Sequence, residues 1–310
     1  MKDGESRKDI HLRSVRGRFS PTANSRTIIE SAKKSPLLCA TVLAKNKAEF
    51  MKTANRAASL GCDIAELRID HLNQPNALSI KEIINSSPVP LIITNRSEHE
   101  GGMFPVSKES LRLSLLEASL DMFPAFVDIE LELPKRNRSA LIELARKRNV
   151  GVICSHHDFG STPSTRQILK LAEEIEDTGA DIAKLVFMPH HNSDSARILE
   201  ASKILGDEKR LFTVFGMGAN GQVTRLANLI VGGRLIYCSQ GRTDKKLGQI
   251  SIGFARRFLD AFDARGWSKS GQARAMLLSN FQRALKTNKK ISNNFDLILT
   301  LARPKRLSKP

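Results

Sequence analysis

The chain lacks the hydrophobic segments that would place it in a membrane or direct its export. Its 310 residues contain no run of 18 or more apolar residues, so the sequence predicts no membrane-spanning helix. The first residues, MKDGESR, do not lead into an apolar segment of the kind that directs secretion. We therefore expect a cytoplasmic protein.

Cysteine is scarce, and the four that occur are far apart. No two of them form a Cys-x-x-Cys pair, and three lie in apolar, strand-like runs. These properties are typical of buried, reduced thiols rather than of disulfides or zinc ligands. The four residues are Cys39, Cys62, Cys154 and Cys238.

Acidic residues are few at the two ends of the chain, and this locates the net charge of +17. Residues 1–35 have a net charge of +5 and residues 265–310 one of +10, which leaves +2 for residues 36–264. We expect two solvated, flexible basic extensions around a nearly neutral folded domain. The alternative is that the extensions bind nucleic acid or another acidic surface. For stacking on bases, the last extension offers only Trp267, Phe281 and Phe295.

The folded domain, residues 36–264, alternates short apolar runs with amphipathic stretches. Strands that alternate with helices pair in parallel. Eight such units in this length favour a closed (β/α)8 TIM barrel over an open doubly wound sheet. The expected strands are 37–43, 63–69, 90–94, 125–131, 150–154, 181–187, 211–215 and 234–238. The expected helices are 47–60, 79–85, 107–120, 137–148, 164–178, 194–205, 222–231 and 250–264.

Helix boundaries are visible at several of these positions. Gly61 and Gly179 are expected to end two helices, because glycine adopts the left-handed conformation found there. Ser107 and Ser110 are expected to begin another helix, because serine side chains cap free backbone N–H groups.

Charged and polar side chains gather where the expected strands end. In a parallel barrel this edge, with the loops that follow it, carries the active site. A random placement would instead distribute charges along the outer faces of the helices. In chain order they are Glu66, Arg68 and Asp70 after the second strand, Arg96 and Glu100 after the third, His157 after the fifth, Lys184 on the sixth, Arg225 after the seventh and Gln249 after the eighth.

Lys184 lies within the apolar run DIAKLVFMP, where an inward-facing lysine would be buried. Burial disfavours the ammonium form, and a neutral amine attacks ketones and forms imines. His157 ends the neighbouring expected strand and can act as a general acid or base. Together the two residues indicate Schiff-base chemistry, whereas an arbitrary lysine is a solvated surface charge.

Two other motifs suggest functions that their surroundings do not favour. Residues 216–221, GMGANG, match a dinucleotide-binding turn, but the acid expected about 20 residues later would be Asp244, which lies in a loop rich in Lys and Arg. The adjacent pairs His156-His157 and His190-His191 could ligate a metal, but neighbouring residues of a strand point to opposite faces. We expect neither a cofactor nor a metal.

Taken in order, these motifs resemble type I 3-dehydroquinate dehydratase, the Schiff-base enzyme of the shikimate pathway, over roughly residues 37–262. The resemblance implies a (β/α)8 barrel that dehydrates 3-dehydroquinate to 3-dehydroshikimate by syn elimination, without a cofactor, and that is often a homodimer. The matching segments are ELRID at 66–70, TNR at 94–96, EGG at 100–102, SHHDF at 155–159, Lys184, Met188-Pro189, Met217-Gly218, Thr224-Arg225 and Gly248-Gln249.

The resemblance also implies roles for the catalytic residues. Lys184 would form the imine, and His157 would remove a proton and then protonate the departing hydroxyl. Glu100 would orient the histidine. The alternative for Glu100 is a solvated loop glutamate.

The remaining positions would bind substrate. Arg225 would hold its carboxylate in a bidentate pair. Glu66, Arg68 and Arg96 would contact the hydroxyls, or would form a purely structural network at the rim with Asp70 as a support. Gln249 matches the glutamine of a closing loop, and Lys245 replaces a serine that many members have four residues earlier. Lys245 either binds the carboxylate in its place or is solvated, and we expect a raised KM.

Two other interpretations are compatible with parts of the pattern. A class I aldolase-like barrel also uses a lysine on a strand, but it requires neither Arg225 nor the His-Asp-Phe triplet at 157–159. A protein with an inactive barrel could instead bind nucleic acid through its basic extensions.

Overall fold

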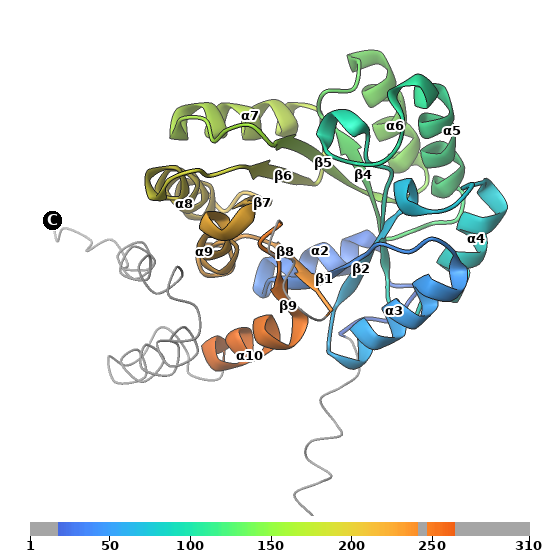
Figure 1. The fold of residues 1–310 in the computed structure, drawn as a ribbon, viewed down its shortest axis with the longest axis horizontal. Helices are drawn as coiled ribbons and strands as arrows, with labels where there is room; N and C mark the ends of the chain where they lie inside the picture. Colours follow the sequence, from blue (N-terminus) through green and yellow to red (C-terminus); the bar gives the residue numbers. More distant parts are fainter. Residues whose placement is uncertain (1–17, 241–246, 264–310) are drawn as a thin grey trace, which may run out of the picture.

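A computed structural model describes residues 18–240 and 247–263, which form a curled parallel sheet with helices on its outer side (Figure 1). The strand order is β7-β6-β5-β4-β3-β2-β1-β8-β9, and every pairing is parallel. The strands are β1 Leu37–Val42, β2 Ile64–Arg68, β3 Leu91–Thr94, β4 Phe126–Glu130, β5 Gly151–Asp158, β6 Ile182–Phe187, β7 Phe212–Gly216, β8 Leu235–Ser239 and β9 Ile250–Ser251.

A helix follows each of the first eight strands, as the sequence predicted, with β9 inserted before the last one. Side chains of Asn46, Asn76 and Ser164 cap three of these helices by accepting a backbone N–H. The α-helices are α2 Ser25–Lys34, α3 Lys47–Ser59, α4 Ala77–Ser86, α5 Glu109–Leu120, α6 Lys135–Lys147, α7 Thr165–Asp177, α8 Asn192–Asp207, α9 Gly218–Ile230 and α10 Ile252–Asp263.

The two ends of the curled sheet meet where β7 and β8 begin. The backbone N–H of Arg234 donates to the carbonyl of Phe212 at 2.8 Å. The Thr213 hydroxyl and the Asn228 amide both donate to the carbonyl of Leu235. No ladder continues from this contact in the described part of the chain. The architecture is the TIM-barrel-like fold that the alternation of strands and helices predicted.

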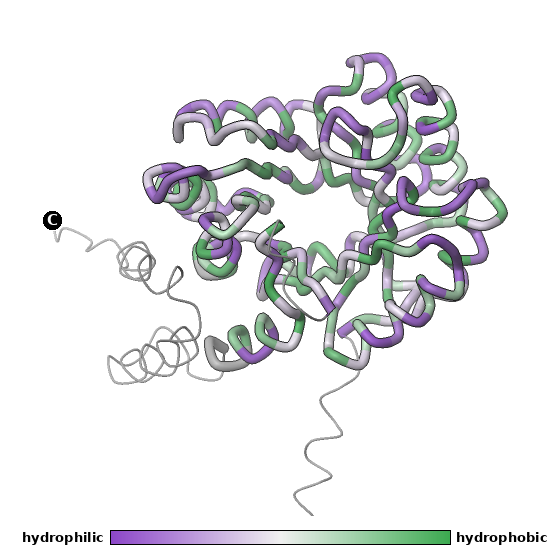
Figure 2. The backbone as a smooth tube through the Cα atoms, in the orientation of Figure 1, coloured by the Kyte–Doolittle hydropathy of each residue, from purple (hydrophilic) through white to green (hydrophobic). Residues whose placement is uncertain are grey.

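Apolar side chains fill both sides of the sheet, and Figure 2 shows hydrophobic strands inside a ring of helices with hydrophilic outer positions. Inside the barrel, Ile64, Phe126 and Ile182 point from the strand starts toward one another. Ile28 and Ala32 of α2 complete this cluster, so α2 closes the N-terminal end of the barrel. A site inside the barrel can therefore open only at the other end, where the strands finish.

The expectation of a solvated N-terminal extension is wrong for residues 25–34. They form α2, and Ile28 is fully buried. Residues 1–17 and 264–310 lie outside the described part of the structure, and the proposed domain limits stay predictions.

Other local expectations are partly correct. Gly61 and Gly179 follow α3 and α7 with φ of 84° and 81°, as expected for helix ends. The expected serine cap of α5 is wrong, because the helix begins at Glu109 after a 3-10 turn and its N-cap is Lys108 without a side-chain bond. Strand β5 continues beyond Cys154 to Asp158, because it pairs with β6 throughout.

The cysteines are buried, as the apolar runs around them predicted. All four cysteines are buried and unpaired, and burial raises the pKa of Cys62, Cys154 and Cys238 to about 12. No helix among the described residues is long and apolar enough to cross a membrane.

Candidate active site

A pocket opens at the C-terminal ends of the strands and brings together eight of the nine site residues expected from the sequence. They come from six strand ends or following loops, those of β2, β3, β5, β6, β7 and β8, so closure of the sheet is what makes them neighbours. The ninth, Lys245, lies outside the described residues. The eight are Glu66, Arg68, Arg96, Glu100, His157, Lys184, Arg225 and Gln249.

Lys184 on β6 is buried with only 4 % of its surface exposed. Its Nζ lies 2.9 Å from Asp128 Oδ2 and 3.4 Å from Glu66 Oε1. The same nitrogen lies 4.1 Å from the ring centroid of Tyr237 on β8. Two carboxylates and an aromatic face thus surround the amine, so its proton acceptors are already in place.

Asp128 is a site residue that the sequence analysis missed. It lies at an inward position of β4, where it accepts hydrogen bonds from Arg96, Ser155 and Lys184 at 2.6–2.9 Å. Burial would raise its pKa, but the charges of Arg96 and Lys184 outweigh burial and hold the pKa well below its usual range. The sequence signal for Asp128 is weak. It is a carboxylate within the apolar strand FVDIE, whose end lies beside the ends of the neighbouring strands.

His157 and Glu100 form a close pair at the ends of β5 and a 3-10 turn after β3. His157 Nδ1 lies 2.8 Å from Glu100 Oε2, which leaves Nε2 for another partner. Glu100 is only 3 % exposed, so the alternative of a solvated loop glutamate is wrong. Gly101 and Gly102 permit this turn, because a side chain on Gly101 would collide with the ring of Phe159.

Burial shifts the two members of this pair in opposite directions. Burial raises the pKa of Glu100 to about 8. The carboxylates of Glu130 and Asp128 act in the same direction, and together these effects outweigh the charge of Arg96. Burial lowers the pKa of His157 well below the usual value, and the charges of Arg96 and Lys184 act in the same direction. Both shifts place the proton of the pair on the Glu100 side.

His156 points to the other face of β5, as the strand alternation predicted. Its Nδ1 lies 3.3 Å from Glu132, and its ring contacts Phe187. Adjacent imidazoles therefore do not meet at one site. Within the described ranges, no group of three metal-ligating side chains occurs.

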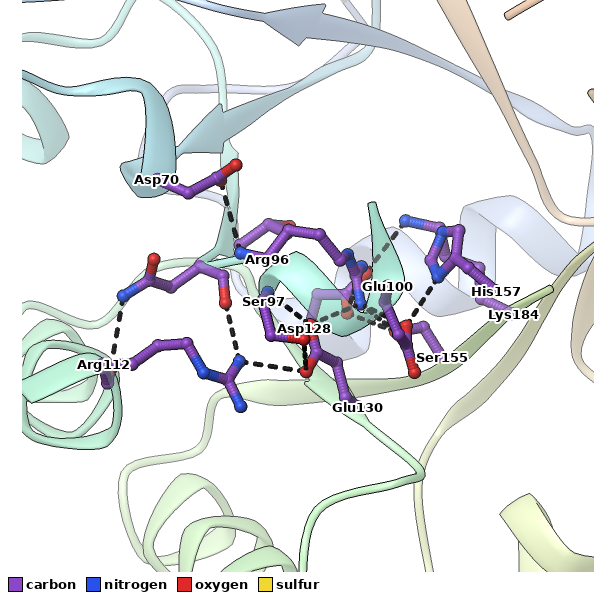
Figure 3. Close-up of polar contacts among 12 residues, drawn as sticks. Asp70, Arg96, Ser97, Glu100, Arg112, Asp128, Glu130, Ser155, His157 and Lys184 are labelled. Carbon is purple, nitrogen blue, oxygen red and sulfur yellow. Dashed lines mark hydrogen bonds and ion pairs between the residues drawn. The ribbon is translucent and has the colours of Figure 1, made fainter. Parts of the chain in front are cut away.

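Arg96 lies at the centre of a buried charge network (Figure 3). Its Nη1 donates to Glu100, Glu130 and Ser155, and its Nη2 donates to Asp128. Both terminal nitrogens therefore contact protein atoms, which favours the structural network over contact with substrate hydroxyls.

Arg68 has a similar partner in Asp70. Its Nε and Nη2 donate to the two carboxylate oxygens at 2.8 and 2.6 Å. Asp70 also accepts the backbone N–H groups of Arg96 and Met103. Asp70 thus holds the loop after β3 against the end of β2.

Arg225 differs from the other buried arginines because no acidic partner contacts it among residues 18–240 and 247–263. Its Nη2 donates to the carbonyl of Leu247 at 2.8 Å, but within the same residues Nε and Nη1 have no hydrogen-bond partner. Its guanidinium lies 4.2 Å from the ring centroid of Phe215, and burial lowers its pKa to about 10. Free donors on a buried cation suit a carboxylate. Gln249 lies nearby in the pocket and donates to Thr41.

The glycines of the GMGANG motif have a packing role in this structure. A side chain on Gly221 would lie 2.2 Å from the carbonyl carbon of Gly216, so the start of α9 packs directly on the end of β7. This close packing places Arg225 over the pocket.

Comparisons with known proteins agree with this geometry. Residues 38–265 match the family described as type I 3-dehydroquinase. A 3-dehydroquinate dehydratase of Methanothermobacter thermautotrophicus is 33% identical over 222 residues, which cover 72% of this chain and 95% of that protein. One from Klebsiella pneumoniae is 29% identical over 232 residues, covering 72% of this chain and 92% of that protein.

Solved structures are similar as well. The type I 3-dehydroquinate dehydratase from Clostridium difficile, with covalently modified comenic acid, has a TM-score of 0.69 and 27% identity, covering 74% of this chain and 93% of that one. The 3-dehydroquinate dehydratase from Geobacillus kaustophilus has a TM-score of 0.68 and 25% identity, covering 75% and 93%.

Proposed function

The chain belongs to the type I 3-dehydroquinase family, and we propose that it dehydrates 3-dehydroquinate to 3-dehydroshikimate through an imine on Lys184. The observation that carries this proposal is the combination within one pocket of a buried lysine, a histidine–glutamate pair and an arginine with free donors. A cyclic ketone that bears a carboxylate and a removable hydroxyl needs these three elements.

Binding begins at Arg225. Its unpaired Nε and Nη1 are donors open to the substrate carboxylate, which would be held in a bidentate pair by one of them together with the second N–H of Nη2. The ring of Phe215 beneath the guanidinium keeps it in place. The carboxylate is fixed in this way, and the ketone can then reach Lys184.

Imine formation requires Lys184 to lose a proton and attack the ketone carbon. Asp128 at 2.9 Å and Glu66 at 3.4 Å are the carboxylates within reach of that proton. The oxygen of the tetrahedral adduct then takes one proton from the nitrogen and the other back from the carboxylate, and it leaves as water. The nitrogen keeps one proton and a positive charge. Tyr237 presents its ring face to this nitrogen, which stabilises the cation.

Elimination follows at the carbon next to the imine. His157 Nε2 removes a proton from this carbon, and the electron pair moves onto the imine nitrogen to give an enamine. The electrons then return to expel the neighbouring hydroxyl, which leaves as water after taking the proton from His157. Because one imidazole serves both steps, the proton and the hydroxyl leave from the same face.

Release of the product restores the lysine. Water adds to the conjugated imine, the carbon–nitrogen bond breaks, and 3-dehydroshikimate leaves. The net change is the loss of one water molecule. For the base step, Nδ1 must carry the hydrogen and donate it to the Glu100 carboxylate, so the active pair holds a single proton and Nε2 is free to accept another.

The other pocket residues would contact the hydroxyls. Glu66, Arg68 and Gln249 line the pocket and present polar atoms to it. Lys245 would stand in the closing loop, outside the described residues. A homodimer and a cytoplasmic location follow from the resemblance and the composition, and light scattering of the purified protein tests the first.

A turnover assay tests the proposed reaction. Protein mixed with 3-dehydroquinate should form the conjugated product, detected as a rise in ultraviolet absorbance, and the Arg225→Gln variant should raise KM by about 10- to 100-fold because a charged pair is lost. Arg210→Gln is the control, since Arg210 precedes β7 at the other end of the barrel and pairs with Glu176. Absence of turnover in the wild-type protein would contradict the proposal, as would equal KM values for the two variants.

The class I aldolase alternative makes a different prediction in the same assay. An aldolase of this class needs the lysine but no arginine that binds a substrate carboxylate. The unpaired donors of Arg225 therefore favour the dehydratase. Cleavage of a β-hydroxy ketone, with no activity on 3-dehydroquinate, would support the aldolase.

A further inference from the structure

Arg112 is a buried cation that lies outside the active-site pocket. It belongs to α5, on the outer side of the sheet, and is 2 % exposed. Its Nη1 lies 3.2 Å from Glu130 Oε2 and donates to the carbonyl of Asn95 at 2.7 Å. Its Nε and Nη2 donate to Glu109, whose side chain is 37 % exposed. Arg112 therefore joins an outer carboxylate to an inner one.

Glu130 connects Arg112 to the catalytic pair. Its Oε1 lies 3.2 Å from Arg96 Nη1, and Arg96 Nη1 lies 2.9 Å from Glu100 Oε2. Glu100 Oε2 is the atom that contacts His157. Figure 3 shows this series of charges running from Arg112 through Glu130 and Arg96 to His157.

The charges in this network must be balanced for Arg96 to stay on Glu100. The single charge of Arg96 is shared among three buried carboxylates, Glu100, Asp128 and Glu130. Arg112 supplies Glu130 with a second cation. Without it, the described partners left to Glu130 would be Arg96 and the backbone N–H and hydroxyl of Ser97, so Glu130 would compete with Glu100 for Arg96.

In the described part of the chain, the charges that act most strongly on Glu100 come from three neighbouring elements. Arg96 approaches from the loop after β3, Asp128 and Glu130 from β4, and Lys184 from β6. His157 contacts it from β5. Among these, Glu130 is the carboxylate whose compensation lies outside the pocket.

We propose that Arg112 is a positioning residue for the acid/base pair. It neutralises Glu130, keeps Arg96 on Glu100, and thereby sets the pH at which His157 is free to accept a proton. This role rests on the proposed function of His157. The competing explanation is that Arg112 only anchors α5 to the end of β3 through Asn95.

The two explanations differ in the pH dependence of kcat/KM. A nearby cation lowers the pKa of an acid/base pair and a nearby anion raises it. Arg112→Met should therefore move the acidic limb of the profile up by about one pH unit, and Glu130→Gln should move it down by a similar amount. If Arg112 only anchors α5, Arg112→Met would lower stability and leave its acidic limb at the wild-type pH. Glu130→Gln would still lower its own limb, because the Glu130 carboxylate acts on Glu100 directly.

Two further variants control for the loss of contacts. Glu109→Gln removes the outer partner of Arg112 on the exposed side, so the limb should stay within about 0.3 pH units of wild type. Arg112→Lys keeps the charge and should restore most of the shift seen in Arg112→Met.

The double variant Arg112→Met with Glu130→Gln keeps the test decisive if Arg112→Met does not fold, because it leaves no unpaired buried charge. The acidic limb of its kcat/KM profile should lie near the wild-type pH, and at a higher pH than the limb of Glu130→Gln alone. A limb equal to that of Glu130→Gln alone would overturn the proposal, as would shifts of Arg112→Met and Glu130→Gln in the same direction.

Failure of the proposed function has a separate signature. If wild-type protein forms no adduct on Lys184, the reaction itself is wrong. If the adduct forms but the limb shifts are not opposite, only the role of Arg112 fails.

Discussion

Glu100 Oε2 and His157 Nδ1 lie 2.8 Å apart, and in the proposed mechanism the protonation of this pair governs activity at the residue scale. The pKa of Glu100 is raised to about 8 because burial and two carboxylates outweigh Arg96. A raised pKa means that the protonated form persists at neutral pH. Since the base step needs the deprotonated pair, activity is lost as pH falls through this value.

We therefore predict that kcat/KM rises between about pH 7 and 9, with a midpoint above the usual histidine value of about 6.5. The profile of initial rates at low substrate concentration measures it, because it reports the free enzyme. A midpoint at or below the usual histidine value would contradict the arrangement of the pair.

The neighbouring histidines offer a matched comparison. His157→Ala should lower kcat by about 10²- to 10⁴-fold through loss of the general acid/base, while imine formation on Lys184 persists. His156→Ala should stay within about twofold of wild type, because its ring faces Glu132 on the other side of β5. Steady-state rates of both variants, with circular dichroism to check folding, measure the difference. Equal losses would show that the strand face does not separate the two roles.

At the scale of single elements, α2 has a structural role that can be isolated. Ile28 is fully buried against the strand starts, at the end of the barrel opposite Lys184. Ile28→Ala should lower the free energy of unfolding by about 2–4 kcal/mol and leave kcat unchanged. Thr27→Ala, on the exposed face of α2, should change it by less than about 0.5 kcal/mol. Urea denaturation of both variants tests this, and equal stabilities would contradict the packing of α2.

The elements differ in how far the sequence could predict them. The strands and their polar ends were predictable, because a buried parallel strand is a short apolar run and its end carries the site residues. Asp128 was not, since one carboxylate within FVDIE does not reveal which face it occupies. Arg112 was not either, because an arginine on a helix usually lies in solvent and only the fold places it behind β4.

The helix α2 was missed for a different reason. Arg26, Lys33 and Lys34 make the segment basic, like the extension before it. Its apolar positions Ile28 and Ala32, four residues apart, are too few to indicate a buried face alone. The open N-terminal end of the barrel supplies the surface that they need, and that surface exists only after the sheet curls.

At the scale of the whole molecule, closure of the sheet assembles the site. Lys184 on β6 and Tyr237 on β8 meet across the barrel, and Arg225 after β7 reaches the carbonyl of Leu247 before β9. Within residues 18–240 and 247–263, the hydrogen bonds that join the sheet ends lie where β7 and β8 begin. At the C-terminal ends of β7 and β8, the contact between Arg225 and the carbonyl of Leu247 therefore joins the two ends of the sheet more than backbone pairing does.

The most direct test of the account is reduction of the enzyme–substrate mixture with borohydride. Mass spectrometry of the digested protein should place one adduct, of the mass of the reduced imine, on Lys184. Lys170→Ala, which removes an exposed lysine of α7, should label as wild type does. An adduct on another lysine, or undiminished labelling of Lys184→Ala, would contradict imine chemistry at Lys184.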